Sequence, residues 1–128
     1  MGKKKIMLSL ESFLLSETDE KGTIRYANEE FCEVSGFKLD ELVGKPHNII
    51  RHKDMPKAAF EDLWKTVKSG KPWKGFVKNA TKSGDYYWVF ATVFPFNSCD
   101  GSKGYLSCRR AASRSEIEKY ENIYKNMK

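Results

Sequence analysis

Apolar and polar side chains alternate in five segments of the chain, and this period of two predicts five β-strands. The strongest is residues 86–94, where every residue except Ala91 is aromatic or β-branched, and Pro95 is expected to taper it. Asp19 to Gly22 has the composition of a turn, so the first two strands are expected to form a hairpin. The other four predicted strands are residues 13–18, 23–27, 73–80 and 104–111.

Three helical segments are predicted between the second and third strands. The first follows Asn28, whose side chain can cap a helix, and ends at Gly36. A single helical turn follows at residues 39–42. The third helix is expected to begin near Asp54 or Met55 and to end at a glycine. Its apolar positions recur at the three- and four-residue spacing of one helix face, at Phe60, Leu63, Trp64 and Val67.

A last helix is predicted at the C-terminal end of the chain. Ser115 and Glu118 have the spacing of a capping box. The apolar residues that follow form a narrow seam, which is typical of a coiled coil or docking helix and also of a helix that packs back on its own domain. The seam consists of Ile117, Tyr120, Tyr124 and Met127.

The order of these elements predicts the fold class. Two strands, three helical segments and three strands indicate an α+β domain with one five-stranded antiparallel sheet and the short helices on one face. The 128 residues are enough for one domain with its own core. We expect a flexible or capping lead-in at residues 1–12, the folded domain at 13–112, and a separate C-terminal helix at 113–128.

Composition and charge exclude several classes of function. The net charge is +6, but basic residues do not alternate with aromatics at a steady spacing, so no nucleic-acid partner is expected. Cys32, Cys99 and Cys108 are widely spaced and odd in number, which indicates neither a zinc site nor a disulfide scaffold. No apolar run approaches the roughly 20 residues that cross a bilayer, so this chain is not expected to insert into a membrane.

Residues 46–56 form a short segment in which polar side chains are crowded between two prolines. The segment contains both histidines, His47 and His52, with Arg51, Asp54 and two of the four prolines. It has neither a strand period nor a helix period. The sequence therefore leaves two interpretations: a ligand-binding loop, or a structural loop that bonds to itself.

The order of elements and the motifs within them resemble a PAS domain, and more narrowly the sensory domain of bacterial aerotaxis receptors. The resemblance covers roughly residues 13–112. Its most specific part is Pro-His-Asn followed by Arg-His-x-Asp-Met-Pro, which marks a branch that holds FAD non-covalently; Lys53 stands where that branch has proline. The matching motifs include Tyr26-Ala27-Asn28, Val34-Ser35-Gly36-Phe37, Glu41-Leu42-Val43-Gly44, Pro46-His47-Asn48, Arg51-His52, Asp54-Met55-Pro56, Trp73-Lys74-Gly75 and Gly84-Asp85-Tyr86-Tyr87-Trp88-Val89.

The resemblance implies a function as well as a fold. It implies that residues 13–112 are a PAS sensory domain and that residues 113–128 are a C-terminal linker or signalling helix. It implies a sensor of redox, oxygen or electron-transport status that turns over no substrate and is not an enzyme. Its expected partner is a chemotaxis transducer or a HAMP or signalling domain, in cis or in trans, with a homodimer as a further option. The implied location is the cytoplasm, or the inner face of the membrane through a longer chain or a partner.

The polar loop supplies the first candidate cofactor contacts. Arg51 can hold a pyrophosphate oxygen bidentately, or form a salt bridge with Asp54. His52 can donate to a phosphate or to the flavin edge, or bond within the loop. Asp54 can cap the following helix, or accept from a ribityl hydroxyl or a flavin nitrogen. His47 is a secondary candidate in the same loop.

Aromatic residues are expected to form the walls of the cleft. An indole stacks well on a flat ring, and of Trp64 and Trp73 the second is favoured, because Trp64 lies on the apolar helix face and is equally explained as core. Tyr87 and Trp88 are neighbours on the strongest strand, so one of them faces the cleft.

Two amides are candidates for the edge of the ring. Asn79 lies on a predicted strand, where asparagine is disfavoured, and such a polar misfit suggests a functional position. Asn28 carries the same donor and acceptor groups, but a helix cap explains it at least as well.

Alternative functions remain open on sequence alone. A haem-binding gas sensor would need an axial ligand, and only His47 and His52 could supply it to haem b. A ligand-free module for interaction or dimerisation would be colourless. Blue-light adduct chemistry is not expected, because residues 48–51 contain no cysteine where a photoactive LOV domain carries its reactive thiol.

Overall fold

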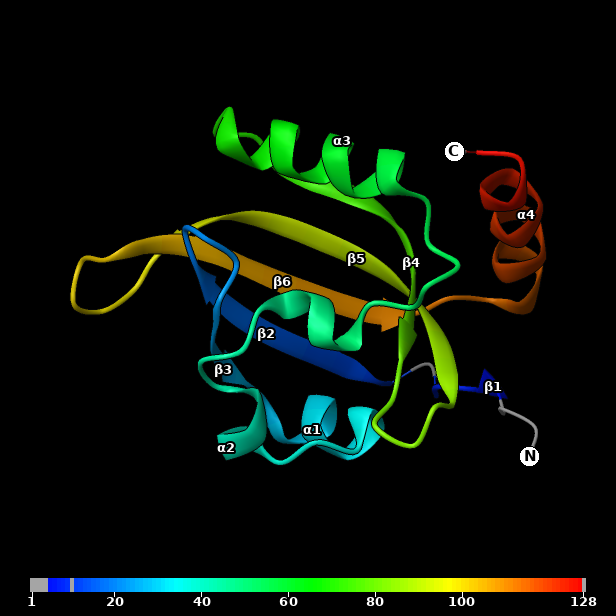
Figure 1. Cartoon of the computed structure of the whole chain (residues 1–128), viewed down its shortest axis with the longest axis horizontal. Helices are drawn as coiled ribbons and strands as arrows, with labels where there is room; N and C mark the ends of the chain where they lie inside the picture. The colour runs from blue at the N-terminus through cyan, green and yellow to red at the C-terminus, as the bar shows by residue number, and fades with distance from the viewer. Residues whose placement is uncertain (1–4, 10, 128) are drawn as a thin grey trace.

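The computed structural model describes residues 5–9 and 11–127, so part of the expected lead-in, residues 1–4 and 10, lies outside the described chain. The described elements follow the predicted order (Figure 1). The strands are β1 (Lys5–Ile6), β2 (Phe13–Asp19), β3 (Ile24–Ala27), β4 (Trp73–Ala80), β5 (Tyr86–Asn97) and β6 (Lys103–Ala111). The helices are α1 (Glu29–Ser35), α2 (Leu39–Leu42), the 3₁₀ helix η1 (His47–Ile50), α3 (Lys57–Lys68) and α4 (Arg114–Lys125).

The five predicted strands form one antiparallel sheet in the order β4-β5-β6-β2-β3. The structure adds a short sixth strand, because Lys5–Ile6 pairs in parallel with Tyr86 and Tyr87. Strand β1 pairs with the first residues of β5, which precede Val89 and are not paired with β6. The α+β class and the antiparallel sheet are therefore confirmed, with this addition.

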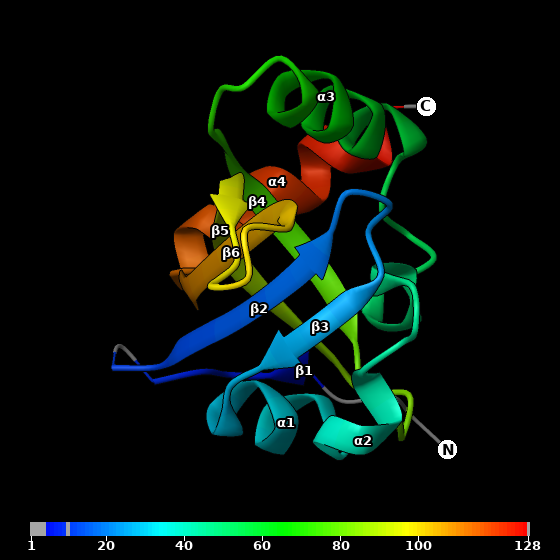
Figure 2. The same cartoon turned by 90° about the vertical axis from the view of Figure 1, so that its left-hand side faces the viewer.

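Helices cover both faces of the sheet. In Figure 2, α1, α2, η1 and α3 surround one side, while α4 lies behind β4, β5 and β6. Tyr87 and Trp88 show the same division, because successive strand residues point to opposite faces. Tyr87 belongs to the main core, whereas Trp88 packs with Ile117 of α4. The expectation that the short helices share one face is confirmed, and the separate C-terminal helix α4 lies on the other face.

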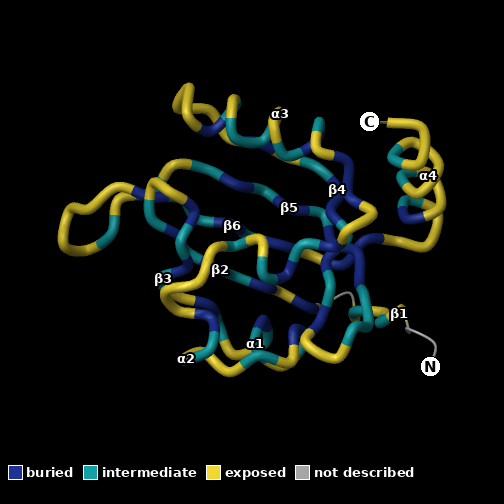
Figure 3. Tube along the Cα trace, in the orientation of Figure 1, coloured by how far each residue is buried: buried dark blue, intermediate teal, exposed yellow. Residues whose placement is uncertain are grey.

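The main core lies between the sheet and the helices α1 to α3. Figure 3 shows buried positions concentrated along the central strands, and exposed positions in the long β5–β6 turn. A smaller second cluster on the outer face joins Phe76, Trp88, Ala112 and Ile117. The C-terminal helix therefore packs back on its own domain, which was one of the alternatives left open by its apolar seam.

Asn28 connects β2 to α1. Its Oδ1 caps the helix by accepting from the Phe31 N–H at 3.0 Å, and it also accepts from the Leu15 N–H at 3.1 Å. Its Nδ2 donates to the Phe13 carbonyl. With all three bonds directed at the backbone, Asn28 has the structural role that a cap predicts.

Three expected boundaries differ from the structure. Helix α3 begins at Lys57 with Pro56 at its N-cap, so Asp54 is not its cap. The capping box of α4 is formed by Ser113 and Glu116, two residues before the expected Ser115 and Glu118. Strand β5 continues through Pro95 to Asn97, because its pairing with β4 has already ended at Val93 and no donor is needed on that edge.

Candidate functional site

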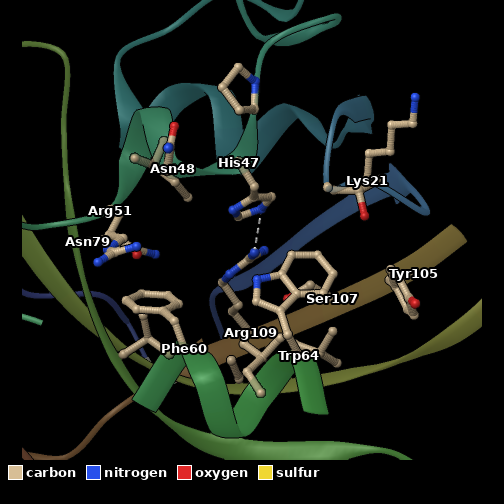
Figure 4. Close-up of a pocket in the computed structure, with 18 residues that line it drawn as sticks. Lys21, His47, Asn48, Arg51, Phe60, Trp64, Asn79, Tyr105, Ser107 and Arg109 are labelled. Carbon is tan, nitrogen blue, oxygen red and sulfur yellow. Dashed lines mark hydrogen bonds between the residues drawn. The ribbon is translucent and has the colours of Figure 1, made fainter. Parts of the chain in front are cut away.

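A cavity of about 280 Å³ lies between the inner face of the sheet, η1, the β2–β3 turn and α3 (Figure 4). This volume is close to the lower end of the about 300–1,000 Å³ typical of ligand pockets. Its apolar lining includes Ile50, Phe60, Leu63, Trp64, Val77 and Val93. Its polar lining includes His47, Asn48, Arg51, Asn79, Ser107 and Arg109.

Arg109 is the central polar group of this cavity. It is 4% exposed, and β6 places it with Ser107 on the inner face of the sheet. Its Nη1 donates to Ser16 Oγ at 3.0 Å and its Nη2 to His47 Nε2 at 2.8 Å. A guanidinium only donates hydrogen bonds. His47 Nε2 must therefore accept, which makes His47 the neutral tautomer with its proton on Nδ1.

The charge of Arg109 is not balanced by a carboxylate. No Asp or Glu among the described residues forms an ion pair with it. Burial lowers the pKa of Arg109 to about 10, so the group is still charged at neutral pH. An unpaired buried charge costs several kcal/mol in effective desolvation. The cavity thus has a positive wall that an anionic or electron-accepting ligand group would stabilise.

Two further polar atoms of the cavity residues lack partners. The amide Nδ2 of Asn79 and the hydroxyl of Ser107 are both buried without a hydrogen bond. Buried polar groups in native structures are almost always bonded. Together with Arg109, these groups offer hydrogen bonds to the polar edge of a bound molecule, and Phe60 and Trp64 of α3 add an apolar wall to the same cavity.

Arg51 lies where the cavity opens to the surface. Its guanidinium lies 4.2 Å from the centre of the Phe60 ring, and its backbone forms an isolated antiparallel bridge with Asn79. Arg51, Phe60 and Trp64 also line a second, outer groove of about 440 Å³. The rest of that groove is formed by the α3 side chains Lys57, Glu61 and Lys68. The inner cavity and the outer groove therefore share a wall, and the groove carries three cations and one carboxylate.

His52 and Asp54 tie the loop to β4 and do not line the cavity. His52 Nδ1 accepts from the Asp54 N–H at 3.0 Å, and Asp54 pairs with Lys78 Nζ at 3.1 Å. The hydrogen bond from Lys78 is the main cause that lowers the pKa of Asp54. Since Asp54 pairs with Lys78 and Arg51 lies over Phe60, the alternative salt bridge between Arg51 and Asp54 is absent among the described ion pairs.

The two candidate tryptophans have different positions. Trp64 lines the cavity, with its ring edge-to-face to Tyr105 at 5.5 Å and close to Gly22, where a Cβ would lie 3.1 Å from the indole. Trp73 lies outside the cavity lining, and its Nε1 donates to Asp62 Oδ2 at 2.8 Å. Trp73, the favoured candidate of the two, therefore fastens β4 to α3 and does not line the cavity, whereas Trp64 does.

The remaining candidates are also divided between the cavity and its supports. His47 and Asn79 line the cavity. Tyr87 faces the inner side of the sheet and is fully buried beneath the cavity, directly across from Asn79 in the β4–β5 register. Asn28 is outside the cavity, in the capping position described above.

Sequence reasoning missed Arg109 and Ser107. A signal was available, because residues 105, 107 and 109 share one face of the last predicted strand. That alternation places a charged residue on the inner face, where burial without a function is costly.

The His47–Arg109 contact predicts a pH-dependent stability. Burial, and then the charge of Arg109, lower the pKa of His47 from 6.5 to about 3. Below pH 6.5 the unfolded chain binds a proton that the folded chain does not, so stability is lost as pH falls. Between about pH 7 and about pH 5 this loss is expected to be about 2 kcal/mol. Urea unfolding at the two pH values measures it.

The matched variants are His47→Gln and His52→Gln. The first is expected to remove this part of the pH dependence, and the second to keep it. Identical pH profiles for wild type and His47→Gln would show that His47 is not held neutral by the fold.

Comparison with known proteins identifies similar sequences. The family model described as the PAS fold matches residues 24–109. The aerotaxis receptor of Escherichia coli (strain K12) is 48% identical over 118 residues, which cover 92% of this chain and 23% of the receptor. The nitrogen fixation regulatory protein of Klebsiella pneumoniae is 28% identical over 110 residues, covering 85% of this chain and 22% of that protein. The chain spans about a quarter of the length of these relatives.

Solved structures show the same fold. The light-state structure of the LOV domain of the blue-light photoreceptor Aureochrome1 superposes with a TM-score of 0.71 at 16% identity, over 90% of this chain and 91% of that one. A light-oxygen-voltage domain studied with a flavin analogue also has a TM-score of 0.71, at 20% identity, over 89% and 86% of the two chains. Within the described residues, no helix has the length and apolar character to cross a membrane.

Proposed function

Since the chain belongs to the PAS family, we propose that it is a sensor domain that binds FAD non-covalently in the cavity and reports redox or electron-transport status to a signalling protein. The chain is a signalling domain rather than an enzyme, because its relatives are a receptor and a regulatory protein. The proposed location is the cytoplasm, free or held at the inner face of the membrane by a longer chain or a partner.

The unbalanced charge of Arg109 is the observation that supports this proposal most. A flavin ring is planar and apolar with one polar edge, and it gains negative charge on reduction. The cavity offers an apolar wall at Phe60 and Trp64, an unpaired donor at Asn79, and the buried charge of Arg109, which no carboxylate balances. The residues present therefore fit the group: Arg109 would stabilise the added charge, and Asn79 would orient the edge.

The outer groove supports FAD over a mononucleotide. The inner cavity is near the lower limit for a ligand pocket, so the diphosphate and adenine must lie outside it. Arg51, Lys57 and Lys68 supply the positive charge that phosphates require, and Arg51 stands between the two spaces. The position of Arg51 on the boundary of both spaces supports a dinucleotide that extends from the cavity into the groove.

The geometry favours flavin over haem. The Nε2 lone pair of His47 is occupied by the bond from Arg109, and Ser16 Oγ lies 3.0 Å from the same nitrogen. His52 does not line the cavity. Neither histidine therefore presents a ring nitrogen to a haem iron.

We further propose a chemotaxis-type signalling domain as the partner, in the same chain or in another protein. The named relatives support this, since the aerotaxis receptor contains a region like this chain within a protein about four times as long. A homodimer and signalling through α4 belong to the same proposal. The helix packs on β4 and β5, the strands that contribute Asn79 and Tyr87.

The deciding experiment is the absorption spectrum of the purified protein after reconstitution with FAD. The two near-ultraviolet and visible bands of oxidised flavin, retained through gel filtration, are the expected result. A Soret band after expression with haem would favour the haem alternative. A colourless protein that retains neither group would favour a ligand-free interaction module.

Arg51→Ala is expected to weaken FAD binding about 10- to 100-fold while changing FMN binding much less. The reason is that a charge-assisted phosphate contact contributes about 1.5–3 kcal/mol, and the second phosphate is present only in the dinucleotide. Fluorescence titration with both flavins measures the difference. Lys53→Ala, an exposed cation of the same loop, is the control. Equal losses for FAD and FMN would contradict the placement of the diphosphate at Arg51.

A further inference from the structure

Three elements meet at one small polar cluster beside the cavity. Strand β2 contributes Ser16, η1 contributes His47 and β6 contributes Arg109, and the three side chains are joined at 2.8–3.0 Å. Figure 4 shows the bond between His47 and Arg109 at the boundary of the cavity. The cluster therefore connects the ligand space to three separate parts of the fold.

The groups that face His47 leave it one ionised neighbour. Helix α1 presents the Phe31 ring edge-on at 6.3 Å, β2 presents the Ser16 hydroxyl, and β6 presents Arg109. On β5, Tyr87 interacts with Arg109, and burial raises the pKa of its phenol, so it stays neutral. Among the described residues, no carboxylate pairs with either His47 or Arg109.

The net charge of the cluster and a ligand beside it changes when the ligand gains an electron. With neutral His47 the cluster carries +1, and one added negative charge brings the site to zero. A proton taken up by His47 returns it to +1. A buried site resists changes in net charge because each is poorly solvated. His47 is the group of the cluster that can titrate, since Arg109 is already protonated and Ser16 does not ionise.

We propose that His47 takes up one proton when the bound flavin gains one electron, and that Arg109 then moves its Nη2 bond from His47 Nε2 to the ligand. This rests on the proposed function. The electron comes from a one-electron reductant and the proton from water, forming an N–H bond at Nε2. The hydrogen bond from Arg109 to Nε2 is lost. Ser16 stays in place, because its hydroxyl can accept from the new N–H as readily as it donated to the lone pair.

The change would alter how η1 is held. Before reduction, His47 is bonded to β6 through Arg109 and to β2 through Ser16. Afterwards the His47 side chain keeps only its hydrogen bond to Ser16 of β2. The 3₁₀ helix η1 and the loop that it begins are then no longer bonded to β6 through His47. The bridge between Arg51 and Asn79 and the ion pair between Asp54 and Lys78 still connect this loop to β4. Reduction of the ligand would thus change the contacts between η1 and β6.

The test is a potentiometric titration of the FAD-loaded protein with dithionite, between about pH 6 and about pH 8. In the wild type, each pH unit is expected to change the one-electron reduction equilibrium tenfold, which corresponds to 59 mV. His47→Gln is expected to make this equilibrium nearly independent of pH. His52→Gln, which changes the histidine outside the cavity, is expected to keep the tenfold dependence.

Infrared difference spectroscopy of wild type labelled with nitrogen-15 histidine provides a second readout that needs no variant. His47 is expected to show one protonated ring nitrogen without ligand and two after reduction. A pH-independent wild-type equilibrium, an unchanged pH dependence in His47→Gln, or a reduced state with neutral His47 would each overturn the inference while leaving FAD binding intact. Failure to retain any flavin would overturn the proposed function, and this inference with it.

Discussion

Arg109→Met is expected to leave the ligand-free domain at least as stable as the wild type while weakening FAD binding about 100-fold or more. The two effects have opposite signs for one physical reason. Arg109 is a buried charge without a carboxylate partner, so an apolar side chain of similar length removes a desolvation cost in the folded state. The same change removes the positive charge proposed to stabilise the flavin edge.

The surrounding groups can tolerate this substitution. Ser16 Oγ and His47 Nε2 lie 3.0 Å apart, so they can remain bonded to each other after the guanidinium is removed. The Phe31 ring, 5.1 Å from the guanidinium carbon, can contact the methionine thioether instead. No new unpaired polar atom is therefore expected in the variant.

Urea unfolding without ligand and fluorescence titration with FAD measure the two effects separately. Arg110→Met is the matched control, because Arg110 is the next residue of β6 but points to the outer face, over the Phe90 ring. It is expected to leave FAD binding unchanged. A destabilised Arg109→Met with normal FAD affinity would show that Arg109 is structural and that the flavin edge lies elsewhere.

The fold was largely predictable because its signals are local. The strand period of residues 86–94, the turn at Asp19 and the cap at Asn28 each act within a few residues of chain, and each reappears in the structure. Strand β1 was missed because two residues carry no period. The early end predicted at Pro95 was wrong because proline is excluded only where both edges of a strand are paired.

The candidate site was predictable only in part, because residues that are close in the sequence can point their side chains to different parts of the fold. The polar loop contains Arg51, His52 and Asp54 within four residues, yet only Arg51 lines the cavity. The η1 turn and the bridge from Arg51 to Asn79 direct the neighbouring side chains toward Lys78 on β4, a partner 24 residues from Asp54. Arg109 is 62 residues from His47, so no local motif could join them.

Ile117→Asp is expected to detach α4 from the sheet while the cavity-bearing domain stays folded. Ile117 is 2% exposed in the outer cluster with Phe76 and Trp88, and a carboxylate there would be buried without a partner. The contact between α4 and the sheet is also weakened by the Trp88 indole N–H, which is buried there without a hydrogen-bond acceptor. A loss of about 3 kcal/mol is sufficient to open the contact.

Hydrogen exchange resolved by segment measures this detachment. Amides of α4 are expected to exchange about 100-fold faster in the variant, whereas those of β5 and β6 change little. Ile123→Asp is the control on the same helix, because Ile123 is 38% exposed and lies outside the cluster. A uniform increase in the exchange rates that includes β5 would mean that α4 unfolds together with the core. A helix that cannot leave the sheet by itself could not serve as a separable signalling element. Faster exchange in α4 alone would instead fit a helix that is held on the sheet by two contacts, the buried Ile117 side chain and the Tyr124 hydroxyl. That hydroxyl donates to the Phe76 carbonyl at 2.6 Å, and Phe76 lies three residues before Asn79 on β4.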